Sequence, residues 1–189
     1  DGDTVKLLAD HTTKWSDVEA GEYATLAVVK KALTLDLNGM TVDYLTVGDV
    51  VPDEEGGILE SYDGNLTVVD NIQGDSCGKI KNLEFVKGSL AIQGGRIGDD
   101  KSSLTCDGNS GTVTISGGTV CNATVGDGAT VTVKNGFNHR GRWSVDSGGT
   151  LSITGGTFKD VQFVNSGTIA ISGGTFEKIS NNDTNTPQP

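Results

Sequence analysis

The stretch GTVTISGGTV at residues 111–120 decides the fold, because it returns as GTLSITGGTF at 149–158 and as GTIAISGGTF at 167–176. Weaker copies also occur: GSLAIQGGRI at 88–97, GNLTVVDN at 64–71, LTLDLNG at 33–39 and ATVTVKNGF at 129–137. A phrase that recurs every ~20 residues is too short to fold alone. It indicates a solenoid, in which each copy buries its apolar side against the next.

Turn pairs that contain glycine set the length of one coil. Successive pairs stand 23, 18, 20 and 18 residues apart, at Gly94-Gly95, Gly117-Gly118, Asn135-Gly136, Gly155-Gly156 and Gly173-Gly174. The predicted unit is therefore a coil of 18 residues that is lengthened in places. The longer intervals, 16 residues from Ile97 to Val113 and 14 from Phe137 to Leu151, mark insertions.

Alternation of apolar and small polar residues predicts three walls in each coil. The first wall has inward columns at Val113 and Ile115, Val131 and Val133, Leu151 and Ile153, and Ile169 and Ile171. A second wall follows the glycines at Ile97, Val120, Phe158 and Phe176, with Phe137 one step early. The third wall aligns Ala123 and Val125 with Trp143 and Val145 and with Val161 and Phe163. Stacking then forms parallel sheets, and Asn109, Asp127, Ser147 and Asn165 are expected to stack at one corner.

We expect one all-β domain over residues 1–180, a three-walled solenoid with coils of about 18–24 residues. Residues 1–60 would supply an N-terminal cap and the first coils, with a helical turn at 15–20 and an exposed acidic loop at 52–57, and 61–180 the regular coils. The polar residues 181–189 are expected to be a linker to further domains of the same polypeptide. Because the chain begins at Asp1, it is expected to be a mature or excised fragment.

Charge and composition exclude several functions. The net charge of −11 leaves no basic stripe for phosphates, so nucleic acid is not an expected partner. No apolar run reaches the ~20 residues that span a bilayer, so membrane insertion is not expected either. The three cysteines Cys77, Cys106 and Cys121 show no zinc-binding spacing, and both one disulfide with a free thiol and no disulfide at all are compatible with them.

The segment Leu33-Thr34-Leu35-Asp36-Leu37-Asn38-Gly39 and the later G-T-Φ-x-I-x-G-G-T-F phrases, where Φ is apolar, carry a resemblance to a known group. They resemble the right-handed parallel β-helix repeats of secreted and cell-surface proteins of Gram-positive bacteria, within the pectate-lyase-like superfamily. The resemblance covers roughly residues 30–180. It implies a right-handed parallel β-helix and an extracellular or bacterial cell-surface location, but no particular activity.

The outward positions favour a non-catalytic module, a rigid stalk or adhesin-type domain that contacts host or environmental glycans. Polysaccharide-cleaving members of this fold need carboxylates, and glycoside hydrolysis needs two of them ~5 to 10 Å apart. The outward positions of the first wall are instead Thr114 and Ser116, Thr132 and Lys134, Ser152 and Thr154, and Ala170 and Ser172. We therefore predict no catalytic residue, and the expected partner is a polysaccharide or a host glycoprotein.

The inserted segment at 138–143 supports an alternative, a carbohydrate-binding or carbohydrate-cleaving domain. It contains His139, Arg140, Arg142 and Trp143, the densest basic cluster in the sequence. Arginines bind carboxylate or sulfate groups in a bidentate manner, and an aromatic ring can stack on a sugar. However, Trp143 also falls in an inward column, which favours core packing, and His139 has no recognisable catalytic partner.

Two further hypotheses concern calcium and ice. Single acids at corners are usual turn formers, with calcium binding between corners as the alternative; they are Asp99, Asp100, Asp107, Asp127, Asp146 and Asp160. No metal site and no cofactor are predicted. The outward threonine rows are similar to the flat faces of ice-binding solenoids, although Val69, Gln93 and Lys134 interrupt them. Ice binding is therefore kept as a remote alternative to ordinary exposed strand threonines.

Overall fold

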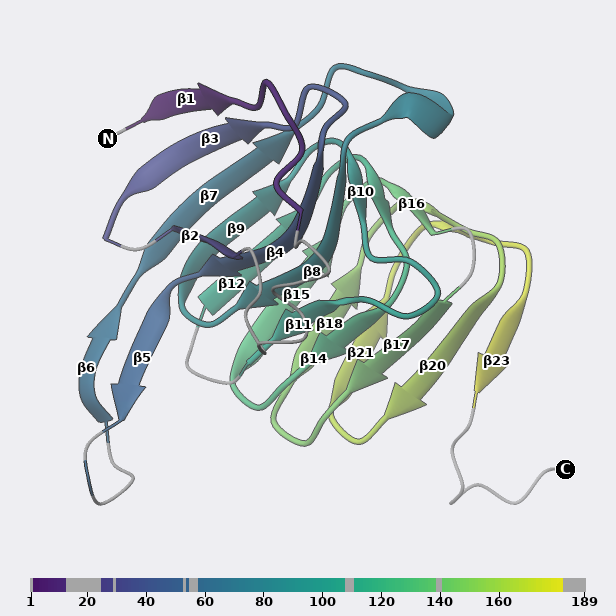
Figure 1. Cartoon of the computed structure of the whole chain (residues 1–189). Coiled ribbons are helices and arrows are strands. Elements are labelled where there is room, and N and C mark those ends of the chain that lie inside the picture. The colour runs from purple at the N-terminus through teal and green to yellow at the C-terminus, as the bar shows by residue number, and fades with distance from the viewer. Residues whose placement is uncertain are drawn as a thin grey trace, which may run out of the picture.

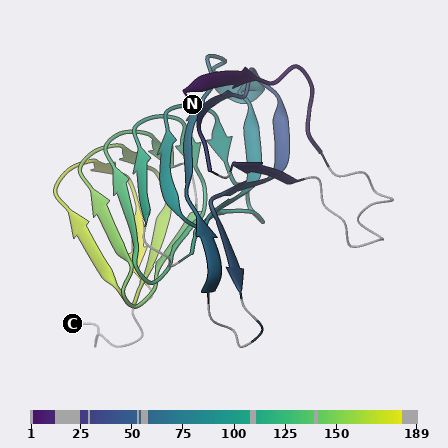
Figure 2. The ribbon, with the colours of Figure 1, turned by 90° about the vertical axis from the view of Figure 1, so that its left-hand side faces the viewer.

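The computed structural model describes residues 2–12, 25–28, 30–52, 54, 58–107, 111–138 and 141–181. These form a parallel β-solenoid of about 7 turns, which confirms the fold class predicted from the repeats. Within the described ranges the regular structure is β-strand, apart from the short 3-10 helix η1 (Gly74–Ser76). Figure 1 shows the coils stacked along one axis, and Figure 2 views the stack from the side.

The first wall is an 8-stranded parallel sheet in which every coil contributes one strand. Its order is β1 (Asp3–Lys6), β3 (Ala32–Asp36), β7 (Gly64–Val69), β9 (Gly88–Ile92), β12 (Gly111–Ile115), β15 (Ala129–Val133), β18 (Thr150–Ile153) and β21 (Thr168–Ile171). Parallel pairing between coils leaves side chains alternately inward and outward, so one face of this sheet is core and the other is surface.

The second and third walls are two branches of one 13-stranded sheet. They join at the seven-residue strands β4 (Thr41–Val47) and β8 (Lys79–Phe85), and β2 (Thr25–Val28) pairs with β4. The second wall continues through β10 (Arg96–Ile97), β13 (Thr119–Val120), β16 (Phe137–Asn138), β19 (Thr157–Phe158) and β22 (Thr175–Phe176). The third wall contains β11 (Leu104–Cys106), β14 (Ala123–Val125), β17 (Gly141–Val145), β20 (Val161–Asn165) and β23 (Ile179–Asn181).

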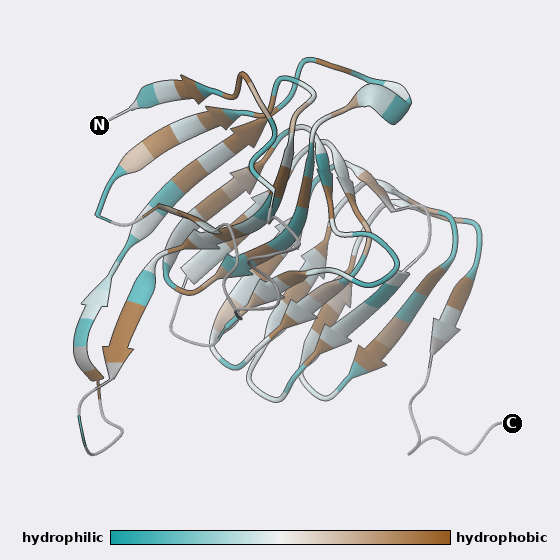
Figure 3. Cartoon of the chain, in the orientation of Figure 1, coloured by the Kyte–Doolittle hydropathy of each residue, from teal (hydrophilic) through white to brown (hydrophobic). Residues whose placement is uncertain are grey.

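The strand register confirms the inward columns predicted for the first wall. Val113 pairs with Val131, and Val131 with Leu151, which in turn pairs with Ile169. The column continues towards the N-terminus through Leu90, Leu66 and Leu33. Figure 3 shows the resulting alternation of hydrophobic and hydrophilic residues along the strands. Burying these side chains against the next coil supplies most of the stabilisation of such a repeat.

The third wall corrects part of the predicted alignment. Trp143 pairs with Phe163 rather than with Val161, and Val145 pairs with Asn165. The predicted stacking of Asn165 with Ser147 is therefore wrong. The reason is a shorter corner after β20, where the Asn165 side chain accepts a hydrogen bond from Gly167 N at 3.1 Å and closes the turn in fewer residues. Asn109, in the same predicted ladder, lies outside the described residues.

The glycine pairs serve two different needs, as Gly117-Gly118 shows. Gly118 has a φ of +69°, a left-handed conformation that glycine adopts without steric cost. At Gly117 the backbone of the previous coil comes close, since a Cβ would collide with the Gln93 carbonyl oxygen. One glycine is thus required by its dihedral angle and the other by the close stacking of coils.

The N-terminal region adds elements outside the regular coils. β1 is the first strand of the first sheet, and β5 (Asp49–Pro52) and β6 (Ile58–Tyr62) form an antiparallel hairpin that projects away from the stack (Figure 2). Glu54 at its tip is exposed, while the rest of the predicted acidic loop at 53–57 and the predicted helical turn at 15–20 lie outside the described residues. No helix among the described residues is long and apolar enough to cross a membrane.

Candidate functional site

The outward face of the first sheet carries two rows of small side chains. One row is Ala32, Asn65, Ser89, Thr112, Thr130, Thr150 and Thr168, and the other is Thr4, Thr34, Thr67, Ala91, Thr114, Thr132, Ser152 and Ala170. The interruptions expected at Val69, Gln93 and Lys134 fall in a third row, so the first two rows are uncharged along the sheet. Over the N-terminal coils, between Gly2 and Thr114, this face contains a groove of about 260 Å³.

Of the four residues predicted to bind a ligand, His139 and Arg140 lie outside the described residues, and Arg142 is exposed. Arg142 lies on a hollow of about 530 Å³ on the third wall, here called the arginine hollow, with Lys101, Asp100, Ser103, Thr124 and Ser144 among its lining. Its position is fixed by Asn122, whose side-chain oxygen accepts a hydrogen bond from Arg142 N at 2.9 Å. Asn122 also donates to the carbonyl oxygen of Asp99 at 2.7 Å, so it links neighbouring corners.

Trp143, the fourth predicted residue, is a core side chain. It is 1% exposed, and its ring packs edge-on against Phe158 with centroids 6.0 Å apart. The indole N–H donates to the Cys121 carbonyl oxygen at 3.2 Å, which satisfies its one polar atom inside the core. The structure therefore separates Trp143 from the exposed side chain of its neighbour Arg142.

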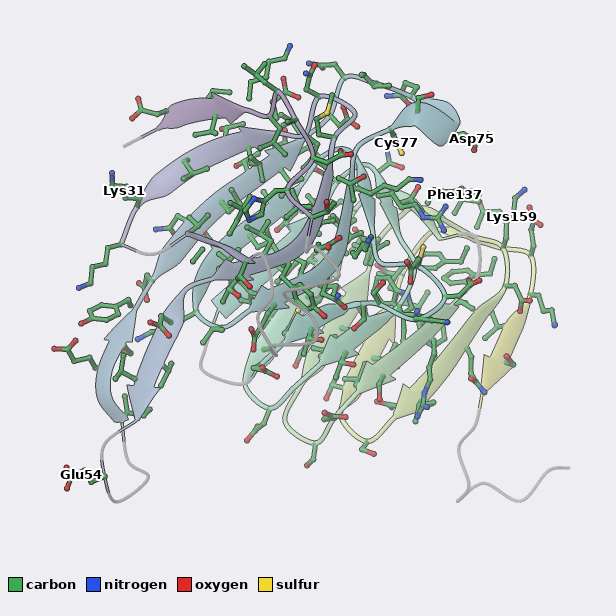
Figure 4. All side chains as sticks on the ribbon, in the orientation of Figure 1. Lys31, Glu54, Asp75, Cys77, Phe137 and Lys159 are labelled. Atoms are coloured by element: carbon green, nitrogen blue, oxygen red, sulfur yellow. The ribbon has the colours of Figure 1, made fainter. Side chains whose placement is uncertain are left out.

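A second basic cluster lies near the N-terminal end of the first sheet, and sequence spacing did not reveal it. Lys30, Lys31 and Lys87 line a hollow of about 510 Å³, here called the lysine hollow, together with Ser61, Tyr62, Asp63, Asn65 and Ala32. The lysines are far apart in sequence and meet because they occupy the corners that precede β3 and β9. In Figure 4, Lys31 projects from the turn that leads into β3.

Specific contacts hold two of these lysines in place. The Lys30 ammonium lies 3.5 Å from the centroid of the Tyr62 ring, a cation–π geometry. Lys87 Nζ donates to Ser61 Oγ at 2.8 Å and lies 3.7 Å from the Asp63 carboxylate. Lys30 has a left-handed φ of +59°, and its N–H donates to the Asp63 carbonyl oxygen at 2.8 Å.

The structure also brings together two carboxyl groups, Glu84 and Asp107. Partial burial of Glu84, the Asp107 charge and a side-chain hydrogen bond between the two raise the pKa of Glu84, and Thr46 opposes this by donating to Glu84 at 3.5 Å. The two residues lie 23 positions apart in sequence, on β8 and just after β11. Both are exposed, so solvent screens their interaction.

Other predicted polar groups have structural surroundings. Asp99 is a turn former, since its Oδ1 accepts hydrogen bonds from Lys101 N, Ser102 N and Ser102 Oγ, and these lower its pKa. None of the three cysteines forms a disulfide, and burial raises the pKa of Cys106. Among the described residues, no group of three or more His, Cys, Asp and Glu side chains is placed to hold a metal ion.

Comparison with known proteins assigns no relative. No family model matches the chain. No curated protein is similar enough to match it. No solved structure matches it either. The function must therefore be argued from the surfaces described above.

Proposed function

We propose that the chain is a non-catalytic module of a secreted or cell-surface bacterial protein, a rigid stalk or adhesin-type domain. The observation that carries this proposal is the unbroken first sheet, in which each strand pairs in register with the next from β1 to β21. A continuous core backs the sheet, and such one-dimensional stacking makes a stiff element that presents an extended surface. The proposed Gram-positive and pectate-lyase-like relationship rests on the LDLNG segment and the GGTF phrases.

A degradation assay tests the non-catalytic assignment. The purified protein is incubated with pectin, hyaluronan, heparin and mucin glycans, and reducing ends and unsaturated sugars are measured. We expect no release above the buffer control. Release that survives repurification and disappears in Glu84→Gln or Asp107→Asn would contradict the proposal and would identify the carboxyl pair as its source.

A second candidate function is carbohydrate binding at the arginine hollow, which the exposure and fixed backbone of Arg142 favour. A guanidinium at this position is suited to a carboxylate or sulfate group of an acidic glycan or glycoprotein. A glycan array compares the wild type with Arg140→Ala and Arg142→Ala. Binding that weakens in the variants supports this candidate, whereas equal binding by all three proteins removes it.

Ice binding has one feature in its favour, the two uninterrupted rows on the first sheet. A thermal-hysteresis measurement decides this alternative. Freezing-point depression beyond the colligative value, reduced by Thr132→Lys but not by Thr154→Lys in the third row, would support it. Colligative behaviour of the wild type would exclude it.

A further inference from the structure

We propose that the lysine hollow binds an acidic glycan, which extends from the hollow into the groove on the first sheet. This inference rests on the proposed function, because it names the ligand and the place at which an adhesive module would bind it. It differs from the arginine hollow in position, since the lysine hollow adjoins the first sheet and the arginine hollow lies on the third wall.

The charge of the lysine hollow is opposite to that of the whole chain. Its lining holds three lysines and one aspartate, 3 − 1 = +2, in a chain of net charge −11. At physiological ionic strength, charges more than ~8 Å apart are largely screened. The groups inside the hollow therefore determine local attraction, and an anionic group meets positive charge there.

The three lysines divide the work of binding. Lys87 is 28% exposed and is shared with Asp63 and Ser61, while Lys30 is held over the Tyr62 ring. Lys31 is exposed, and no side-chain hydrogen bond or ion pair to another described residue is found for it. Lys31 can therefore turn its ammonium to an incoming carboxylate or sulfate, and Lys87 and Lys30 supply charge at fixed positions.

The hollow continues into a surface suited to an extended polar chain. Ala32 and Asn65 line both the lysine hollow and the groove, so the two are adjacent on the first sheet. The groove presents the hydroxyl-bearing side chains Thr34, Thr67 and Ser89, which donate and accept hydrogen bonds as sugar hydroxyls do. This combination of anion-binding lysines and neutral polar groups favours a glycan over a nucleic acid, which would need more phosphate contacts.

The test measures binding of the whole chain to immobilised heparin, which is sulfated, hyaluronan, which is carboxylated, and neutral dextran at ~0.15 M salt. The wild type is compared with Lys31→Ala/Lys87→Ala and with Lys134→Ala/Lys159→Ala, which removes the same charge elsewhere on the surface. We expect binding to one or both acidic glycans, weakened about tenfold or more in the first variant and about twofold or less in the control. Lys31→Arg should retain binding.

Each outcome decides the proposal. Binding to heparin alone identifies sulfate as the recognised group, and binding to both identifies negative charge in general. Equal loss in the two double variants, binding to dextran, or no binding by the wild type overturns the proposal. These results leave the non-catalytic assignment intact, because only release of sugar products contradicts that assignment. Melting temperatures of all variants, expected to equal that of the wild type, exclude unfolding as the cause of lost binding.

Discussion

At the scale of the residue, adjacent positions on one strand lie in opposite environments. Ile153 is fully buried in the core, whereas Thr154 immediately after it is exposed. Ile153→Asp would place an unpaired charge among apolar side chains, and we expect a loss of about 3–5 kcal/mol in the free energy of unfolding. Thr154→Asp should change it by less than about 0.5 kcal/mol. Urea unfolding measures both, and similar midpoints would contradict the register.

A buried carboxylate holds the turns of the N-terminal coils together. Asp70 is 7% exposed and accepts hydrogen bonds from the backbone N–H groups of Gly39, Ile72 and Gly78. Asp70→Ala removes the acceptor for all three donors, and we expect a loss of about 2–4 kcal/mol in urea unfolding. Asp75→Ala, on the exposed helix η1, is the matched control and should cost little. Equal losses would show that Asp70 is not the link between these turns.

The carboxyl pair should make stability depend on pH. Because the pKa of Glu84 is raised above its ordinary 4.5, the folded state holds more proton than the unfolded state just above that value. Stability therefore falls as pH rises through this window. Glu84→Gln should raise the melting temperature at pH 7 by about 1–2 °C, since solvent screens the exposed pair, and change it little at pH 4. Glu60→Gln is the control, and a lower melting temperature of Glu84→Gln at pH 7 would refute the sign.

At the scale of the element, the sequence predicted inward columns better than corners. Alternation fixed the first sheet because a slip by one residue would expose every Val, Leu and Ile of a strand. The third wall slipped by two residues at Phe163, which keeps the same side inward and therefore leaves no trace in the apolar pattern. Likewise, no local signal joins Lys30 and Lys87, since only the stacking of coils brings their corners together.

The short corner after β20 is testable by itself. Asn165→Ala removes the side-chain acceptor of Gly167 N, and we expect a loss of about 1 kcal/mol. Ser147→Ala, in the longer corner of the previous coil, should have less effect. Thermal unfolding of the two variants provides the comparison. If Ser147→Ala is the more damaging change, the Asn165 turn is not what closes the last corner.

At the scale of the whole molecule, the C-terminal end of the described stack differs from its middle. Ile171 is 48% exposed, whereas Ile153 in the same column one coil earlier is 0% exposed. Ile179 is 50% exposed, whereas its partner Val161 is 0% exposed. The final described coil thus covers its predecessor while its own inward residues remain partly accessible.

This difference predicts position-dependent costs for one substitution. Ile171→Asp should lower the free energy of unfolding by about 1 kcal/mol or less, because solvent reaches the new carboxylate, whereas Ile153→Asp loses several times more. Chemical denaturation of the two variants gives the comparison. Equal losses would mean that Ile171 is covered in solution.

The register of the three walls also determines how the protein should respond to mechanical force. Hydrogen bonds between coils run along the stacking axis, so a pull along that axis loads the bonds of the terminal coil before those of its neighbours. Coils should then peel off one at a time from an end. Each coil of about 18 residues would release roughly 60 Å of extended chain. A domain built in this way would yield in small steps, and would extend under load without losing all of its structure at once.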